Sequence, residues 1–379
     1  MTKTQIAFLI AFGLSLLFYL LPRKEYESVV ISEPSITLPT GKVHIFYDAS
    51  FRNKTFDGAF LNWYTNSSTE KYDAAFYPEL GLYSSKDPKV IDLHMKQIQS
   101  TGVGVVVVSW WPDDFERSPP MSLILEHAQK YGLKVTVHIQ NYPNRTLHNL
   151  MTNFVKILKM YDAHPAFYKL KVPSKKRPLP LIYIYEPLAF NPNKWNLLLS
   201  STSNFTIRET RFDALFIGLI VEDTDQYVVT NSNFDGFYTW LSLCRSTYAS
   251  TWYNWPYIQD FARDRGLIFI PSVSPGYDYR LSSDNINPRL IPPRIARNSG
   301  MYYNNAWSRA VVSRSKFVAI NSFNGWLEGT QIEPAETSEK AYTLLKTNFE
   351  DYTPENSDVY LQMTREWVIE FSNRSLYRP

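Results

Sequence analysis

The sequence predicts an α/β fold, a (β/α)₈ TIM barrel, and two observations carry this prediction. From residue 42 onward, eight short apolar runs alternate with segments whose apolar residues recur at helical spacing. Eight strand–helix units with long loops also need roughly 330 residues, which the 379-residue chain supplies. A doubly wound open sheet is the alternative, but no G-x-G-x-x-G motif, P-loop or internal repeat in the sequence favours it.

The strands are identified by near-continuous apolar character, because the strands of a parallel barrel are buried on both faces. The run GVVVVSWW at 104–111 is the clearest case, since β-branched residues fit a buried pleated surface. The expected strands cover residues 42–49, 104–111, 134–140, 181–186, 213–221, 234–240, 267–273 and 317–320.

Helices are expected between most of these strands. Ile91, Met95 and Ile98 fall on one helical face, and Gly132 is a natural C-cap for the helix that precedes it. The expected helices cover residues 90–100, 123–131, 150–162, 194–199, 257–265, 301–312 and 359–371.

The N-terminal segment is expected to be a signal anchor, and thus a membrane contact. Residues 6–21 are uncharged and almost wholly apolar, and with their flanks they reach the lower limit for a spanning helix, about 17 residues. A cleaved signal peptide is the alternative, but no A-x-A-like site follows the apolar run. The expected organisation is an anchor over 1–24, a short stem over 25–41 and a single barrel domain over 42–379.

Five N-x-[ST] sequons favour a lumenal location for the barrel. Each motif alone is weak, but five of them behind a hydrophobic N-terminus point to the secretory pathway. The charges that flank the apolar segment are balanced, so they do not fix its orientation by themselves. The candidate acceptors are Asn53, Asn66, Asn144, Asn204 and Asn373.

The composition narrows the classes of function. The net charge is only +3, and no basic run is longer than 175–177, which argues against a nucleic-acid partner. The aromatic fraction of 16% suits core packing and also carbohydrate sites, where sugar faces stack on rings. The single cysteine, Cys244, excludes an intrachain disulfide and a cysteine-based zinc site. No cofactor or metal is expected.

The C-terminal ends of barrel strands face one pocket, so the residues there are candidate site residues. These positions combine carboxylates with aromatic side chains, which suits glycoside chemistry. They show no metal-ligand spacing, and the absence of a G-x-S-x-G motif argues against a serine hydrolase. The residues are Tyr47, Asp48, Trp110, Trp111, His138, Gln140, Tyr185, Glu186, Glu222, Asp223, Tyr238, Trp240, Ser272, Tyr277, Asn324 and Glu328.

The stretch FVAINSFNGWLEGTQIE at 317–333 is the strongest candidate, because an apolar strand there delivers polar and aromatic residues at its end. Glu328, between Leu327 and Gly329, has little structural purpose, and its pKa should be high if it lies in an apolar pocket. Asn324, Trp326 and Glu333 are further candidates.

Structural interpretations compete with several of these assignments. Side chains alternate along a strand, so one of Trp110 and Trp111 is expected in the core and the other is a candidate sugar platform. His138 fits equally well as a hydrogen-bonded barrel histidine. Glu186 and Glu222 are equally candidates for pairing with a buried arginine such as Arg294.

Several longer stretches resemble the endo-α-1,2-mannosidases, glycoside hydrolase family 99, from about residue 43 to the C-terminus. The similar stretches are HIFY at 44–47, FYPELGLYSSKDP at 76–88, SWWP at 109–112, HPAFY at 164–168, FIPSVSPGY at 269–277, SFNGWLEGTQIE at 322–333 and DVYLQMTREW at 358–367.

This resemblance implies a glycosidase-like barrel in the lumen, attached to the Golgi membrane as a single-pass type II protein. It implies that the partner is a mannose-containing N-glycan or glycoprotein, and that glucosylated high-mannose glycans are cleaved internally with retention. In that chemistry one Glu acts as base on the substrate's 2-hydroxyl, and a second Glu three residues later protonates the leaving oxygen. The implied substrate-binding residues are Tyr47, Trp110, Trp111, His138, Gln140, Glu186, Glu222, Tyr238, Tyr277, Asn324, Trp326 and Glu333.

One departure from the family pattern bears directly on catalysis. The family motif resembles S-F-N-E-W-H-E-G-T-Q-I-E, so Glu328 occupies the acid position and Gly325, without a side chain, occupies the base position. A positioned base or acid contributes roughly 10²–10⁴-fold to the rate. The chain also departs from the family at 48–51, at Gln140 and at Leu327.

Three interpretations remain open at the level of sequence. The first is an endo-α-mannosidase-like protein with impaired activity that still binds mannosides. The second is a working glycosidase in which Asp48, Glu186 or Glu222 replaces the missing base. The third is a glycoprotein whose barrel serves protein contacts alone, which an apolar or blocked pocket would favour.

Overall fold

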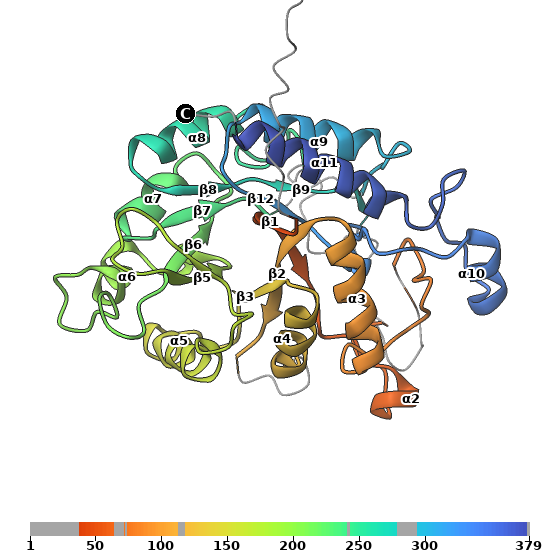
Figure 1. Ribbon diagram of the computed structural model, residues 1–379, viewed down its shortest axis with the longest axis horizontal. Coiled ribbons are helices and arrows are strands. Elements are labelled where there is room, and N and C mark those ends of the chain that lie inside the picture. The colour runs from red at the N-terminus through yellow and green to blue at the C-terminus, as the bar shows by residue number, and fades with distance from the viewer. Residues whose placement is uncertain are drawn as a thin grey trace, which may run out of the picture. The chain divides into compact units, whose positions relative to one another are not determined.

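The computed structural model shows a nearly closed barrel of parallel strands surrounded by helices (Figure 1). It describes residues 38–63, 72, 74–112, 118–240, 243–278 and 294–376. This architecture confirms the prediction of a (β/α)₈ barrel. The barrel strands are β1 (Thr40–Tyr47), β2 (Val103–Trp110), β3 (Lys134–Ile139), β5 (Leu179–Ile184), β6 (Leu215–Leu219), β7 (Gly236–Tyr238), β8 (Ile268–Ile270), β9 (Ser272–Val273) and β12 (Val318–Ile320).

The barrel closes through a strand that Pro271 divides into β8 and β9. β8 pairs with β7, whereas β9 pairs with β12, where Ser272 lies opposite Ala319. Proline has no amide hydrogen to donate to the ladder, but the Pro271 carbonyl accepts a 2.9 Å hydrogen bond from the Ala319 amide. Because β8 and β9 share one position, the parallel segments of the described chain fill eight positions around the barrel.

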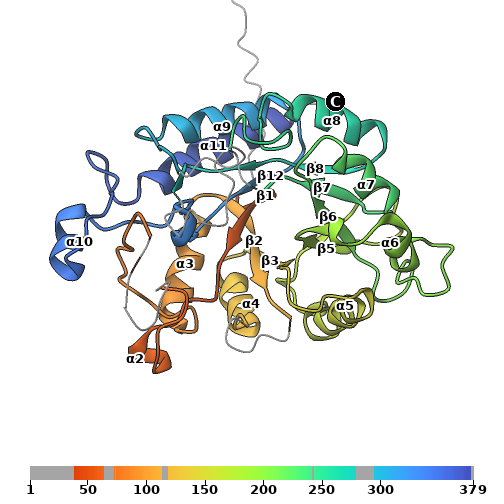
Figure 2. The ribbon, with the colours of Figure 1, turned by 180° about the vertical axis from the view of Figure 1, so that it is seen from behind.

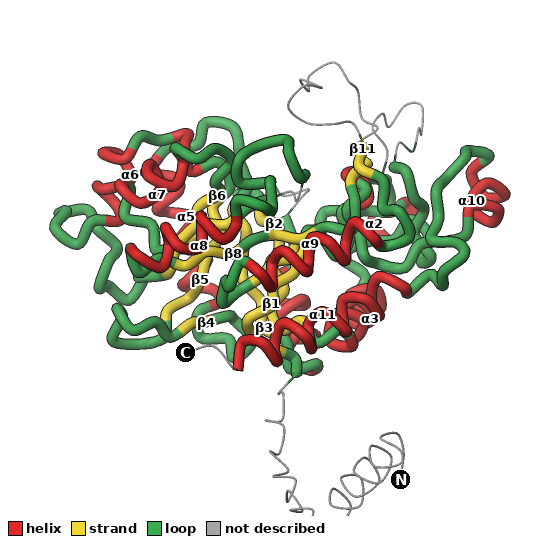
Figure 3. The backbone as a smooth tube through the Cα atoms, turned by 90° about the horizontal axis from the view of Figure 1, so that it is seen from above, coloured by secondary structure: helices red, strands yellow, loops and turns green. Residues whose placement is uncertain are grey.

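Helices enclose the strands when the barrel is seen from the front, from behind and from above (Figures 1, 2 and 3). Local capping fixes several helix starts: Asp87 accepts from the Lys89 amide, and Thr146 forms a capping box with Asn149. The surrounding helices are α3 (Pro88–Ser100), α4 (Met121–Lys130), α5 (Leu147–Tyr161), α6 (Pro192–Leu199), α7 (Asp225–Asn231), α8 (Trp255–Asp264), α9 (Met301–Val312) and α11 (Val359–Leu376).

Smaller elements that the sequence analysis did not predict lie at the ends and edges of the barrel. α7 was missed because its short sequence contains the β-branched residues Val228, Val229 and Thr230, which weaken the helical signal. α10 lies away from the strands in all three views of the chain. The other unpredicted elements are α2 (Lys54–Asp57), β4 (Lys169–Leu170), η1 (Pro187–Ala189), β10 (Tyr277–Asp278), β11 (Arg294–Ile295), η2 (Trp326–Glu328) and α10 (Ser338–Leu345).

The predicted membrane anchor over 1–24 lies outside the described residues, as do residues 25–37 of the predicted stem. Within the described ranges, no helix combines the length and apolar character that a bilayer span requires.

The barrel interior is packed with rings rather than left open. Tyr183 and Tyr238 are fully buried there, and each bonds a buried histidine: His44 Nδ1 lies 2.6 Å from the Tyr183 hydroxyl and His138 Nε2 lies 2.6 Å from the Tyr238 hydroxyl. Burial lowers the pKa of His44 to about 4 and that of His138 to about 3, so both are neutral at physiological pH. Phe46 packs against His138, Tyr183 and Tyr238. It also lines a pocket at the C-terminal ends of the strands.

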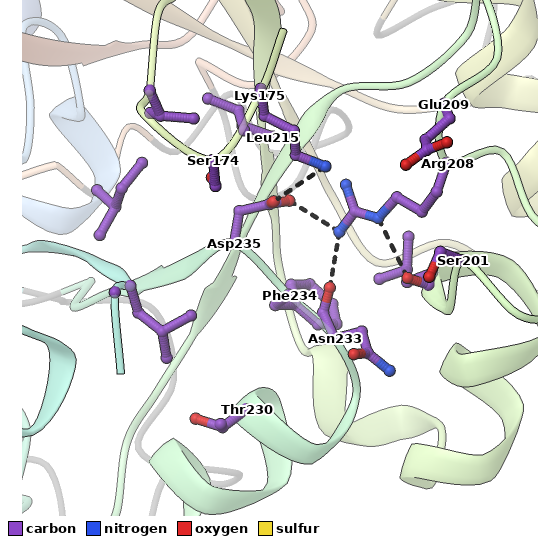
Figure 4. A pocket seen from close by; sticks show the side chains of 15 residues that line it. Ser174, Lys175, Ser201, Arg208, Glu209, Leu215, Thr230, Asn233, Phe234 and Asp235 are labelled. Atoms are coloured by element: carbon purple, nitrogen blue, oxygen red, sulfur yellow. Dashed lines mark hydrogen bonds and ion pairs between the residues drawn. The ribbon is translucent and has the colours of Figure 1, made fainter. Parts of the chain in front are cut away.

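The N-terminal end of the barrel contains a paired-charge cluster (Figure 4). Arg208 lies 3.1 Å from Asp213 and 2.8 Å from Asp235, and Lys175 lies 3.4 Å and 3.8 Å from the same two carboxylates. The cluster borders a cavity of about 400 Å³. Because its two cations and two carboxylates neutralise each other, and because this end of a barrel usually serves stability, we interpret the cluster as structural.

Candidate active site

A pocket of about 240 Å³ opens at the C-terminal ends of the strands, where the sequence predicted the site. We call it the barrel pocket. Side chains of β1 and β2 and of the loops after β1, β2, β3, β7 and β12 contribute to it, so segments far apart in the sequence meet there. Its lining residues are Phe46, Tyr47, Asp48, Phe51, Ser109, Trp111, Gln140, Trp240, Asn321, Ser322, Gly325, Trp326, Leu327 and Glu328.

Glu328 is placed in the barrel pocket by the single turn η2. The turn ends at Gly329, whose φ of 64° is left-handed and suits glycine. Burial raises the pKa of Glu328 from 4.5 to about 7, and the negative charge of Asp48 adds to this effect. The carboxyl group therefore keeps its proton up to a pH of about 7, in line with the high pKa expected from the sequence for a carboxyl in an apolar pocket.

Gly325 lies at the start of this turn, and its surroundings leave little room for a side chain. An added Cβ would lie 2.4 Å from both Ser322 Oγ and Thr330 Oγ1. These two hydroxyls are 3.0 Å apart, and Ser322 Oγ also accepts a 2.7 Å hydrogen bond from the Gly325 amide. Hydrogen bonds thus cross the loop at Gly325, where a side chain would have to enter.

Asn324 acts as a clamp between two strand ends rather than as a pocket-lining group. Its Oδ1 accepts from the Asp48 amide at 2.8 Å, and its Nδ2 donates to the Asp48 carbonyl at 2.8 Å. This pair of bonds holds the end of β1 against the loop that follows β12.

Glu333 lies beneath the loop, fully buried and saturated with hydrogen bonds. It accepts from Tyr83 at 2.8 Å, His94 at 3.0 Å and Trp326 Nε1 at 2.9 Å. The hydroxyl of Tyr47 in turn lies 3.0 Å from His94 Nδ1 and points away from the pocket. Glu333 and Tyr47 therefore support the pocket wall, and Trp326 connects this network to the pocket itself.

Trp111 lines the barrel pocket, whereas Trp110 is buried in the core between strands and helices. Gln140 also lines the pocket and orients toward His138 Nδ1 at 2.9 Å and Ser109 at 3.2 Å. His138 itself belongs to the barrel interior below, as the structural interpretation of this histidine anticipated. Tyr238 occupies the same interior layer.

The structure does not bring Glu186 or Glu222 into the barrel pocket. Glu186 is exposed, has a left-handed φ of 48°, and accepts a 2.6 Å hydrogen bond from Asn141. Glu222 is exposed beside the start of α7. Neither pairs with Arg294 in the described contacts; that arginine lies 3.5 Å from Asp278 and 2.6 Å from Glu350.

Tyr277 also lies outside the pocket lining, buried in β10 next to η2. The pocket lining includes Asp48 and Trp240, which the sequence placed at the ends of two strands. It also includes Phe51, Ser109 and Leu327, for which no signal in the sequence indicated a site role. Among the described residues, no group of three or more potential metal ligands is present.

Comparisons with known proteins agree with this geometry. The family model for glycosyl hydrolase family 99 matches residues 40–373. The chain belongs to this family. Glycoprotein endo-alpha-1,2-mannosidase of Xenopus laevis is 38% identical to this family 99 chain over 358 residues, covering 87% of the chain and 77% of the relative. The human glycoprotein endo-alpha-1,2-mannosidase-like protein is 33% identical, covering 87% and 75% respectively.

The barrel of this family 99 member also resembles a solved structure. The GH99 endo-alpha-mannosidase from Bacteroides thetaiotaomicron superposes with a TM-score of 0.78 at 32% identity, covering 89% of this chain and 99% of that one. A glycosidase function is therefore supported at the level of the family, and the barrel pocket is the place where such a function would reside.

Proposed function

We propose that this protein binds mannose-containing N-glycans in the barrel pocket and cleaves them internally, as an endo-α-mannosidase whose activity is impaired. The observation that carries the proposal is Glu328: a carboxyl group with a pKa of about 7 in the pocket of a family 99 barrel. Such a group is able to protonate a glycosidic oxygen at neutral pH. The names of the mannosidase relatives support a mannoside substrate.

The remaining pocket residues suit a sugar. Trp111 and Trp240 offer ring faces for the apolar faces of a hexose, while Gln140 and Ser109 offer hydrogen bonds to hydroxyl groups. The pocket is open and partly polar, which speaks against a barrel that serves protein contacts alone.

The impairment follows from Gly325. Gly325 stands where the resemblance of this stretch to the family motif implies a base, and a positioned base contributes roughly 10²–10⁴-fold to a rate. We therefore expect glycan affinity to be retained better than turnover.

The location that we propose is the lumenal side of the Golgi membrane, with the N-terminal segment as a type II anchor. The exposure of Asn144 and Asn204 supports it, because both sequon asparagines are accessible to glycosylation. Asn53 differs, since its side chain caps α2 and donates to the Leu82 carbonyl at 3.1 Å.

Mass spectrometry of the secretory-pathway product should find glycans on Asn144 and Asn204. The absence of glycans from both residues would contradict a lumenal barrel.

The test is hydrolysis and binding of a glucosyl-α-1,3-mannoside glycan by the purified full chain, beside Glu328→Gln and Trp111→Ala. We expect slow hydrolysis that falls as pH rises through about 7, no hydrolysis by Glu328→Gln, and weaker binding by Trp111→Ala. Glu222→Gln, an exposed carboxylate outside the pocket, is the matched control and should behave as the native chain.

Two results would count against the proposal to different degrees. Tight glycan binding without hydrolysis would leave a mannoside-binding protein built on a glycosidase barrel. Neither binding nor hydrolysis, in a chain that is folded by circular dichroism, would overturn the proposed function altogether.

A further inference from the structure

A second carboxyl group lies in the barrel pocket, although position 325 has none. Asp48 directly follows β1 and lines the same cavity as Gly325 and Glu328. Glu186, Glu222 and Asp223, the other carboxylates expected near the strand ends, are exposed and do not line this cavity. Among the described residues that line the pocket, Asp48 and Glu328 are the two carboxylates.

Asp48 is held against the loop that contains Gly325. The Asn324 side chain bonds both the amide and the carbonyl of Asp48 at 2.8 Å, and Asn324 directly precedes Gly325. β1 and β12 are also neighbouring strands, with Ile45 paired to Ile320. The backbone of Asp48 therefore has a fixed position beside the 325–328 turn.

The carboxylate of Asp48 is oriented by a local turn. Its Oδ1 accepts from the Ser50 amide at 2.9 Å and from the Ser50 hydroxyl at 2.5 Å. These bonds restrict the side-chain rotamer, which is what a group acting on a bound substrate requires.

The carboxyl groups of Asp48 and Glu328 interact electrostatically. The charge of Asp48 is the second contribution, after burial, to the raised pKa of Glu328. A pair of carboxyl groups in one pocket is the arrangement that glycoside hydrolysis uses, one as acid and one as base.

We infer that Asp48 is the general base of this site and substitutes for the carboxyl group that position 325 lacks. The inference rests on the proposed glycosidase function. Asp48 removes the proton from a hydroxyl group whose oxygen bonds to the anomeric carbon. The glycosidic C–O bond breaks in the same step, and the proton of Glu328 passes to the leaving oxygen.

The attacking hydroxyl belongs either to water or to the sugar itself, and the chemistry at Asp48 is the same in both cases. Attack by water completes hydrolysis directly and inverts the anomeric carbon. Attack by a sugar hydroxyl is followed by attack of water on the resulting cyclic product; Glu328 then takes the proton of water, and Asp48 returns its proton to the sugar oxygen.

The experiment compares two substrates, because the two roles respond differently to the leaving group. One is the glucosyl-α-1,3-mannoside glycan, and the other is a glucosyl-mannoside with a dinitrophenyl leaving group, which departs without protonation. The variants are Asp48→Asn, Glu328→Gln and the exposed control Glu222→Gln. Asparagine retains the Oδ1 acceptor for Ser50, so Asp48→Asn is expected to fold; the melting temperature and glycan binding check this.

We expect Asp48→Asn to lose roughly 10²–10⁴-fold in kcat on both substrates. Glu328→Gln should lose a similar factor on the glycan but little on the dinitrophenyl substrate. Asp48→Glu, which keeps a carboxylate, should retain part of the activity. The anomeric configuration of the first-formed product, followed by NMR, distinguishes water from the sugar hydroxyl as nucleophile.

The inference is overturned if Asp48→Asn hydrolyses the dinitrophenyl substrate within twofold of the native rate. It is also overturned if the native chain hydrolyses neither substrate. In that second case glycan binding would still sustain the binding part of the proposed function, so the two failures are distinguishable. A loss confined to KM would instead make Asp48 a substrate-binding residue.

Discussion

At Glu328 the raised pKa that suits the proposed acid role also lowers the stability of the fold at neutral and alkaline pH. In the folded protein its pKa is about 7, whereas its ordinary value is 4.5. Between these values the unfolded chain releases the proton while the folded chain keeps it, so the free energy of unfolding falls as pH rises. At about 1.4 kcal/mol per pKa unit, the loss at pH 7 and above is at most about 3 kcal/mol.

Glu328→Gln should therefore stabilise the protein at neutral and alkaline pH, because the neutral amide resembles the protonated acid. We expect equal stability near pH 4 and a gain of up to about 3 kcal/mol at pH 8. Urea unfolding at both pH values measures this, with the exposed Glu186→Gln as control. A pH-independent difference between native chain and Glu328→Gln would contradict the assigned titration.

The packing around Gly325 favours glycine at this position. Gly325→Ala should destabilise the fold by about 1–3 kcal/mol, because the new Cβ must displace the hydroxyls of Ser322 and Thr330. The same crowding opposes the introduction of a carboxylate by Gly325→Glu. Gly132→Ala is a useful comparison, since a Cβ there meets no atom within 4 Å and only its left-handed φ of 70° resists the change. Thermal unfolding that leaves Gly325→Ala at the native melting temperature would refute this account.

At the scale of elements, the loop after β12 is held from below by Glu333 and from the side by Arg297. Arg297 Nη2 donates to the carbonyls of Gly329 at 3.0 Å and Gln331 at 2.8 Å. Its guanidinium also packs over three rings, with 4.6 Å to Phe76, 5.0 Å to Tyr352 and 4.6 Å to Tyr360. One residue thus ties the turn that carries Glu328 to the C-terminal part of the chain.

Arg297→Lys should loosen this loop, because an ammonium group cannot stack flat on three rings while it bonds the two loop carbonyls. We expect a loss of about 2 kcal/mol in stability and faster amide hydrogen exchange over residues 325–331. Arg309→Lys is the matched control, since Arg309 stacks on the half-exposed ring of Tyr253. Equal exchange rates in both variants would show that Arg297 does not restrain the loop.

At the scale of the whole barrel, its two ends carry different features. The C-terminal end carries the barrel pocket, and the N-terminal end carries the paired cluster around Arg208. Between them lies a packed layer of buried rings with the neutral histidines His44 and His138. This packed interior separates the charges of the two ends.

Arg208→Met should therefore cost stability without changing the pocket. Removing the cation leaves Asp213 and Asp235 buried with Lys175 alone, and breaking a buried pair costs about 3–5 kcal/mol. We expect a lower melting temperature with unchanged glycan affinity in the fraction that remains folded. The exposed Arg177→Met should change neither quantity. A change in glycan affinity with Arg208→Met would show that the two ends are coupled.

Local chain chemistry was enough to predict the barrel and the end at which the barrel pocket opens. Apolar runs that alternate with helical spacing define strands and helices through short-range periodicity, and parallel strands always present their C-terminal ends to one side. For the same reason Glu328 was identifiable, because it follows a buried strand within a polar and aromatic run.

Only the tertiary structure decided which strand-end residues share the barrel pocket. A residue just beyond a strand is directed by the conformation of its loop: the left-handed backbone at Glu186 turns it to solvent, whereas the Asn324 clamp keeps Asp48 at the pocket. Only the tertiary structure showed which of the two tryptophans has which role: Trp110 packs in the core, and Trp111 lines the barrel pocket. These outcomes depend on contacts between residues distant in sequence, about which the local pattern carries no information.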